Sequence, residues 1–108
     1  MRFEVLLTEG AHRDLEDIYT YVAEHDGLGK AEDLLVHIEQ VIESLSTYPD
    51  RGSYPNELSA LGIREYRQGF FKPYRIIYRV MGKRVYIYLI ADGRCDFQTL
   101  LAWRLLSS

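Results

Sequence analysis

The chain has 108 residues, 47% of them hydrophobic and 27% charged, with a formal net charge of −3 at pH 7. This length suits one domain, because two would each be too small to bury a core, and the composition excludes disordered and fibrous proteins. No apolar run approaches the roughly 18–20 residues that span a bilayer, and acidic residues come too early for a secretory signal. We therefore expect one cytoplasmic domain over residues 1–108.

The charges are divided unevenly along the chain. Residues 1–50 carry twelve acidic and three basic residues, a net charge of −9, whereas residues 51–108 carry four acidic and ten basic residues, a net charge of +6. We expect an electrostatically two-faced fold whose basic side accepts an acidic partner.

The first half of the chain predicts a strand followed by two helices. Residues 2–7, RFEVLL, form a short apolar stretch typical of a strand, and Thr8 stands where a helix N-cap is expected. Apolar residues recur on one helical face over 11–22 and, after the break HDGLGK at 25–30, over 31–45. Two amphipathic helices joined by a short turn form an antiparallel hairpin that must cover a sheet.

In the second half, a loop with two prolines and a glycine at 48–57 precedes a change of period to two. The strands expected from this alternation are residues 63–68, 71–80 and 84–90. Residues 96–106 predict a short closing helix with Asp96 as its possible N-cap. The fold class is therefore α+β, with the hairpin packed on a mainly antiparallel four-stranded sheet.

The turn between the last two predicted strands sets their register. Gly82-Lys83 suits a two-residue type II′ turn, whose first central residue needs a positive φ, so paired residues have numbers that add to 165. One face then holds apolar pairs and should receive the hairpin: Val80–Val85, Tyr78–Ile87 and Ile76–Leu89. The outward face holds the pairs Arg79–Tyr86, Ile77–Tyr88 and Arg75–Ile90. A slip of one residue would bury both arginines, so the register is well specified.

Arginine beside tyrosine on a sheet face is open to two interpretations. Such pairs form a surface for phosphate or carboxylate, or they simply keep a half-exposed face soluble. Other basic residues in the same part of the chain favour a binding surface: Arg64, Arg67, Lys72, Lys83, Arg84 and Arg94.

We expect no metal site and no cofactor. His12 and Glu16 share a helical face, but two groups do not make a zinc site. The single cysteine, Cys95, excludes an internal disulfide and has no histidine near it in sequence. No glycine-rich phosphate loop or hydrolase motif is present. The acids that could serve as general bases, but that more often form salt bridges, are Glu57, Asp92 and Asp96.

Three stretches carry a resemblance to a known family. They are YPDRGSYPNEL at 48–58, GIREYRQGFFKPYRIIYRV at 62–80 and VYIYLIADGRCDFQTLL at 85–101. Together with the order of predicted elements, they resemble the ParE/RelE superfamily of toxins from type II toxin-antitoxin systems, most closely its ParE, or plasmid-stabilisation, branch. The resemblance covers nearly the whole chain.

The resemblance implies a RelE/ParE-like fold in which the helix hairpin packs on the sheet. It also implies a partner antitoxin, encoded beside the toxin, whose C-terminal segment wraps around the toxin and neutralises it. The ParE branch is known for inhibiting DNA gyrase, whereas the RelE branch cleaves messenger RNA in the ribosomal A site.

The residues at the positions of the RelE nuclease site favour gyrase inhibition over RNA cleavage. RelE-type cleavage uses an arginine on the third strand, matched by Arg75, and a second arginine where this chain has Cys95, with Arg94 one place earlier. It also uses a C-terminal tyrosine where this chain has Leu101. No catalytic residue is therefore firm, and the candidates for a nuclease are Arg75 and Arg94. We expect a growth-inhibiting toxin that binds gyrase, with a RelE-like ribosome-dependent endoribonuclease as the alternative.

Contact with the antitoxin or the target is expected from basic and aromatic residues of the second half: Arg64, Arg67, Arg75, Arg79, Tyr86 and Tyr88. An antitoxin segment should lie partly on the helix hairpin and partly along exposed sheet or a strand edge. It should be acidic where it meets the arginines.

Overall fold

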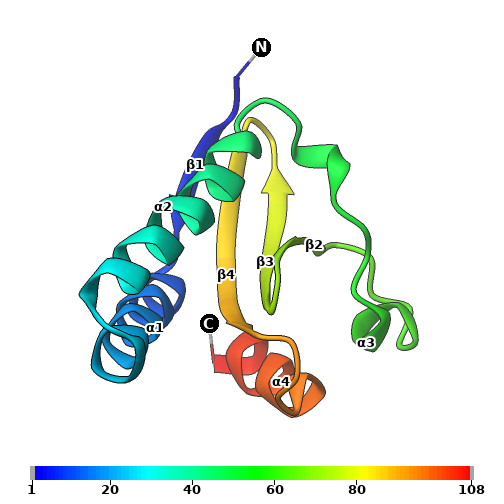
Figure 1. Ribbon diagram of the computed structural model, residues 1–108. Coiled ribbons are helices and arrows are strands. Elements are labelled where there is room, and N and C mark those ends of the chain that lie inside the picture. The colour runs from blue at the N-terminus through cyan, green and yellow to red at the C-terminus, as the bar shows by residue number, and fades with distance from the viewer. Residues whose placement is uncertain (1, 108) are drawn as a thin grey trace.

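The computed structural model describes residues 2–107 as one four-stranded sheet with helices packed against it (Figure 1). In chain order the elements are β1 (Glu4–Leu7), α1 (Glu9–Asp26), α2 (Leu28–Ser44), the 3-10 turn η1 (Pro49–Arg51), α3 (Asn56–Ser59), β2 (Arg67–Phe71), β3 (Tyr74–Met81), β4 (Arg84–Asp92) and α4 (Phe97–Ser107). The sheet order is β1-β4-β3-β2, with β1 parallel to β4 and the other neighbours antiparallel. The expected α+β architecture is confirmed. None of the helices within 2–107 is long and apolar enough to cross a membrane.

Several boundaries differ from the prediction: β1 begins at Glu4 and not at residue 2, β3 covers Tyr74–Met81 and not 71–80, and β4 extends to Asp92 and not to residue 90. Two further differences have clear physical reasons. The break between the long helices is shorter than HDGLGK, because Gly27 alone, at φ 100°, separates α1 from α2. A side chain would be strained at that φ, so glycine makes the tight turn possible. β2 begins at Arg67, four residues later than predicted, because residues 63–66 belong to the connection from α3.

The predicted N-cap of α1 is confirmed and also fastens the helix to the sheet. The Thr8 side-chain oxygen accepts a hydrogen bond from the Ala11 backbone N–H at 3.2 Å and donates one to the Ile87 carbonyl at 2.9 Å. A single residue therefore satisfies a free N–H of the first turn and holds α1 against β4.

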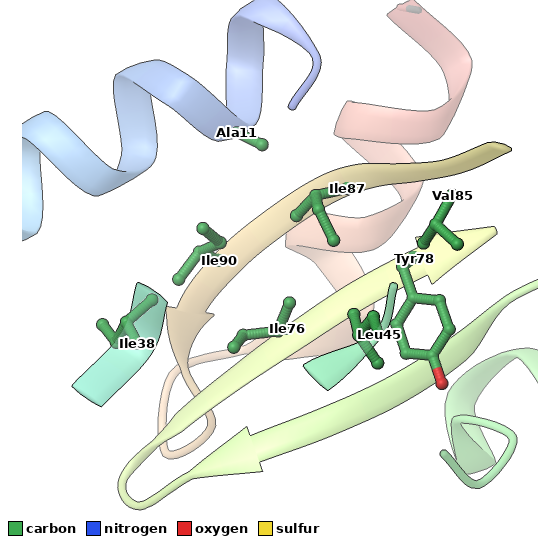
Figure 2. Packing of buried hydrophobic residues seen from close by; sticks show 8 residues of the cluster. All are labelled: Ala11, Ile38, Leu45, Ile76, Tyr78, Val85, Ile87 and Ile90. Atoms are coloured by element: carbon green, nitrogen blue, oxygen red, sulfur yellow. The ribbon is translucent and has the colours of Figure 1, made fainter. Parts of the chain in front are cut away.

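The helix hairpin covers one face of the sheet, called here the inner face. In the core of this face, side chains from α1, α2 and the residue after α2 pack against side chains from β3 and β4 (Figure 2). The buried residues of this core are Ala11, Ile38, Leu45, Ile76, Tyr78, Val85, Ile87 and Ile90. The Tyr78 ring is fully buried, and its hydroxyl donates to the Pro49 carbonyl at 2.7 Å and accepts from the Gly52 N–H at 3.1 Å. Burial raises the pKa of Tyr78, so the hydroxyl stays a neutral anchor for the η1 loop.

The predicted register holds only near the turn. Gly82 has φ 63°, and Val80, Arg79 and Tyr78 pair as expected with Val85, Tyr86 and Ile87. Beyond Tyr78 a bulge shifts the register, so three predicted pairs are wrong: Ile76–Leu89, Ile77–Tyr88 and Arg75–Ile90. The observed partners are Ile90 for Ile76, Leu89 for Ile77 and Ala91 for Arg75.

Two side chains satisfy the backbone at the bulge. Asp14 of α1 accepts from the Ile90 N–H at 3.0 Å, and Arg104 of α4 donates to the Tyr88 carbonyl at 2.9 Å. Asp14 and Arg104 also form a bidentate pair with distances of 2.7 and 2.8 Å. The extra residue of the bulge places Leu89 and Ile90 on the faces opposite to those predicted. Asp14 and Arg104, which bond to the bulge and to each other, tie α1, β4 and α4 together.

Because Leu89 turns to the outer face, that face has a core of its own. Leu89 packs there with Ile77, Leu58 of α3, and Phe97 and Leu101 of α4. α4 is capped as predicted, since Asp96 accepts from the Thr99 N–H at 3.3 Å. The outer face is therefore not the open, solvated surface that the alternating pattern suggested.

Candidate functional site

Arg75 lies on the outer face of β3, but its side chain is only 13% exposed. Its Nη1 and Nη2 donate to the two carboxylate oxygens of Glu57 at 2.8 and 2.9 Å, and its Nε donates to Gln68 Oε1 at 3.0 Å. The guanidinium carbon lies 3.9 Å from the centre of the Phe97 ring. The prediction that Arg75 turns toward solvent is wrong, because α3 and α4 cover this part of the sheet.

The four residues around this arginine, Arg75, Glu57, Gln68 and Phe97, form what we call the Arg75 cluster. Hydrogen bonds from Arg75 lower the pKa of the Glu57 carboxyl, so this carboxylate stays ionised to a lower pH than an ordinary glutamate does. Gly93 makes room for the arginine stem, since a Cβ there would lie 2.7 Å from Arg75 Cδ. The cluster joins α3, β2, β3 and α4, which indicates a structural role.

Arg94 is next to Gly93 and therefore close to Arg75 in the fold, but its environment is different. Its side chain is 78% exposed, and its Nε and Nη2 donate to Asp92 at 3.0 and 2.6 Å. These bonds lower the pKa of Asp92. Both candidate catalytic arginines thus already have a carboxylate partner. Within residues 2–107, no three His, Cys, Asp or Glu side chains gather as metal ligands would.

The part of the outer face left open by α3 and α4 carries three of the predicted contact residues. Arg79 lies over the Tyr66 ring at 5.7 Å, and Tyr66 meets Tyr88 edge-on at 5.4 Å between ring centres. Tyr86 is the cross-strand partner of Arg79. Tyr66 was not predicted as a contact residue, because IREYRQ was interpreted as a strand and gave no sign that its tyrosine would pack beneath Arg79.

Arg64 and Arg67 share one tyrosine on the connection between η1 and β2. Their guanidinium carbons lie 5.8 and 4.6 Å from the centre of the Tyr54 ring. Arg67 also donates to the carbonyls of Asp50 at 3.2 Å and Gly52 at 2.8 Å. Arg67 thus holds the loop onto β2, whereas Arg64 is exposed.

Four arginines of residues 2–107 form no ion pair with a carboxylate, and all four lie within about 6 Å of a tyrosine ring, the range of cation–π attraction. They are Arg51 (over Tyr48), Arg64 and Arg67 (over Tyr54) and Arg79 (over Tyr66). We call these seven residues the arginine–tyrosine edge. A guanidinium stacked on a ring still presents its in-plane N–H groups, so this edge suits an anionic partner.

The segment that carries most of the arginine–tyrosine edge, from η1 to β2, begins beside the end of α2 and then runs away from the helix hairpin (Figure 1). In Figure 1 the segment from η1 to β2 runs down the right side, and α1 and α2 lie on the left. Residues 9–44, which span the hairpin, carry ten acidic and two basic residues. The expected division of charge is therefore present in the fold.

Residues 5–97 match the family model described as "ParE toxin of type II toxin-antitoxin system, parDE". The chain belongs to this family. It is 32% identical over 97 residues to Toxin ParE3 of Caulobacter vibrioides (strain ATCC 19089 / CIP 103742 / CB 15), covering 90% of this chain and 93% of that one. The resemblance to type II toxins of the ParE branch is thus confirmed.

Two solved structures share the fold of this ParE-family toxin. A chromosomal ParDE toxin-antitoxin system from P. aeruginosa superposes with a TM-score of 0.71 at 23% identity, covering 84% of this chain and 96% of that one. The toxin-antitoxin complex RelBE2 from Mycobacterium tuberculosis gives a TM-score of 0.63 at 20% identity, covering 89% and 95%. The RelE/ParE-like fold is therefore confirmed.

Proposed function

We propose that this ParE-family toxin inhibits growth in the cytoplasm by binding DNA gyrase, without cutting RNA. One observation carries the second half of this proposal: the N–H groups of Arg75 already point at Glu57 and Gln68. Cleavage of a phosphodiester needs donors aimed at the charge that develops on the phosphate and a group that moves protons. An arginine whose donors are directed to an internal carboxylate does not supply this. The first half, gyrase as the target, rests on membership of the ParE family.

The alternative is a RelE-like endoribonuclease in which Arg75 and Arg94 contact the scissile phosphate. The fold shared with the RelBE2 toxin-antitoxin complex supports it. It would require Arg75 to leave Glu57 and Arg94 to leave Asp92. Leu101, which stands at the position of the nuclease tyrosine, is 1% exposed in the outer core and has no group that moves a proton. The residues therefore favour binding over cleavage.

We further propose that a cognate antitoxin, encoded beside the toxin, neutralises it. The similar solved structures are a ParDE toxin-antitoxin system and a RelBE2 toxin-antitoxin complex, which supports such a partner. The predicted contact residues that remain exposed or partly exposed, and so suit an antitoxin or a target, are Arg64, Arg67, Arg79, Tyr86 and Tyr88.

Two assays on one preparation of purified toxin test the target. The toxin should inhibit supercoiling by gyrase and cause broken DNA to accumulate, and it should leave messenger RNA intact on programmed ribosomes. Ribosomal cleavage that a folded Arg75→Ala variant has lost would contradict the proposal. Growth inhibition should disappear when the neighbouring small reading frame is co-expressed, and a failure to rescue would contradict the antitoxin.

A further inference from the structure

The outer face of β3 and β4 stays open between the Gly82 turn and the outer core. Val85 and Ile87 of β4 belong to the inner core, so Tyr86, which lies between them, faces outward. Its cross-strand partner Arg79 faces the same way, and both side chains are partly exposed. β3 and β4 each have a neighbouring strand on both sides. This part of the molecule therefore offers side chains to a ligand, and not a free strand edge.

The bulge in β4 adds a second tyrosine to this open surface. Tyr88 is the extra residue of the bulge, because the pairing with β3 passes from Ile87 to Leu89 without it. Bulges re-aim side chains, and the Tyr88 ring meets the Tyr66 ring edge-on at 5.4 Å between ring centres. The guanidinium carbon of Arg79 lies 5.7 Å from the centre of the same Tyr66 ring. We call this group the tyrosine platform, and its members are Tyr66, Arg79, Tyr86 and Tyr88.

Positive charge gathers at the end of the tyrosine platform near the turn. Lys83, in the turn, and Arg84, at the start of β4, are exposed, and Arg84 shares the Glu4 carboxylate at 3.2 Å. With Arg79, this end carries three basic residues against one acidic residue. The other end, at Tyr88, borders a cavity lined by three acidic and two basic residues. An anionic ligand is therefore attracted to the end near the turn and not to the cavity.

Two features favour a nucleic acid strand over an acidic protein segment as this anion. Because β3 and β4 are paired on both sides, a peptide finds no backbone groups here with which to extend the sheet. Tyrosine rings, and a guanidinium held over one of them, are surfaces on which unpaired bases stack. A carboxylate would use the positive charge but none of the three rings.

The spacing of the rings favours an unpaired strand over a duplex. Tyr86 and Tyr88 are two residues apart on β4, a separation of roughly 7 Å along a strand. Bases in a duplex follow one another at about 3.4 Å, and their faces are already covered by their neighbours. An unpaired, extended strand can place bases on the two rings and its phosphates near Arg79 and Lys83.

We propose that the tyrosine platform binds a single strand of DNA. Bases stack on Tyr86 and Tyr88, Arg79 and Lys83 contact phosphates, and Tyr66 is a positioning residue that supports Arg79. This inference deepens the proposed function and rests on it, since gyrase acts on DNA and the toxin is expected to make broken DNA accumulate. A toxin that holds both the enzyme and an opened strand of its DNA hinders the rejoining of that strand.

The first test measures binding of a labelled dT12 oligonucleotide to the full-length toxin by fluorescence anisotropy. Tyr86→Ala removes a stacking ring, and Tyr86→Phe keeps it. The matched control Tyr21→Ala removes a ring of α1 that is 61% exposed. We expect Tyr86→Ala to weaken binding by about tenfold, and the other two variants to weaken it by less than about twofold. Equal affinities of Tyr86→Ala and Tyr86→Phe, or a wild-type toxin that does not bind dT12, would overturn the proposal.

A second pair of variants decides if Tyr86→Ala does not fold, which circular dichroism would reveal. Lys83→Ala removes an exposed charge from the turn, and the matched control Lys30→Ala removes an exposed charge from α2. The affinity for dT12 is measured over a range of salt concentrations. For Lys83→Ala we expect the slope of log affinity against log salt to become shallower by about 0.7, the effect of one lost phosphate contact. The same slope in Lys83→Ala and Lys30→Ala would show that the strand does not reach the turn, and the proposal would be wrong.

Other outcomes assign the tyrosine platform to a different ligand. Tighter binding of rU12 than of dT12, with the same dependence on Tyr86, would assign it to RNA, and equal binding of a DNA duplex would show attraction to phosphates without stacking. If the antitoxin and not dT12 depends on Tyr86, the platform serves a protein. Each of these results contradicts the proposal.

Failure of the inference and failure of the proposed function give different results. A toxin that inhibits gyrase but does not bind dT12 would contradict only the inference. A toxin that binds dT12 through Tyr86 but leaves supercoiling unchanged would contradict the proposed function, while the tyrosine platform would remain a site for a DNA strand.

Discussion

The two faces of the sheet are covered in different ways. On the inner face, two long helices bury a continuous apolar core against β3 and β4. On the outer face, the four-residue α3 and the eleven-residue α4 cover a smaller core. Two ion pairs, Arg75–Glu57 and Arg104–Asp14, hold these short helices in place. The inner face therefore depends mainly on apolar area, whereas the outer face combines a smaller apolar core with two ion pairs.

The largest effect should come from a truncation in the inner core. Ile76→Ala removes a fully buried side chain from the centre of the sheet. It should lower the free energy of unfolding by about 3 kcal/mol, measured by urea denaturation. The control Leu61→Ala alters a side chain that is 66% exposed, and it should change stability by less than about 0.5 kcal/mol. Similar losses in both variants would show that the inner core is not the main source of stability.

The next largest effect should come from the Arg75 cluster. Arg75→Ala leaves the Glu57 carboxylate, 24% exposed, without its partner, and it should lower the free energy of unfolding by about 2–3 kcal/mol. The double variant Arg75→Ala/Glu57→Ala should lose less than the sum of the single losses. We expect a coupling of about 1–2 kcal/mol in a double-mutant cycle, and strictly additive losses would contradict the structural role of the pair.

The outer face should also respond to acid. Arg75 lowers the pKa of Glu57 below its ordinary 4.5, so the carboxylate stabilises the fold above that pH. This stabilisation is lost as the pH falls from about 4.5 through the lowered value, because the unfolded chain takes up the proton before the folded protein does. The unfolding free energy of the wild type should fall more steeply on acidification below pH 4.5 than that of Glu57→Gln. Parallel pH profiles for the two proteins would contradict this account.

The smallest effect on stability should come from the open part of the outer face. Arg79 lies over the Tyr66 ring and has no carboxylate partner within residues 2–107. Arg79→Ala should change the free energy of unfolding by no more than about 1 kcal/mol, while the amount of toxin needed to inhibit gyrase should rise. A stability loss as large as that of Arg75→Ala would show that Arg79 is structural and not part of a binding surface.

Local patterns were enough to predict most of the inner face, but not which of Leu89 and Ile90 packs against the helices. The Thr8 cap, the helix hairpin and the positive φ of Gly82 each depend on residues close together in the chain. The bulge in β4 was missed because it depends on Asp14 and Arg104, which lie 76 and 16 residues from the backbone groups they bond. No alternation within β4 indicates those partners.

The same limit applies to the candidate site. Alternation correctly placed Arg75 on the face opposite the helix hairpin, but its exposure depends on α3, which begins inside the stretch 48–57 predicted to be a loop. The sequence marks Glu57 as an acid that could serve as a general base or form a salt bridge, but it does not indicate Arg75 as the partner. The resemblance to the ParE/RelE superfamily identified Arg75 as the residue to examine, and the geometry then gave it a structural partner.

We propose that this ParE-family toxin acts by binding gyrase and not by chemistry at Arg75. The most direct measurement is supercoiling by purified gyrase as folded toxin is added. We predict that supercoiling falls as toxin is added and recovers when the antitoxin is supplied. Supercoiling that is unchanged by folded toxin, at concentrations at which the same preparation cleaves messenger RNA on ribosomes, would contradict the claim.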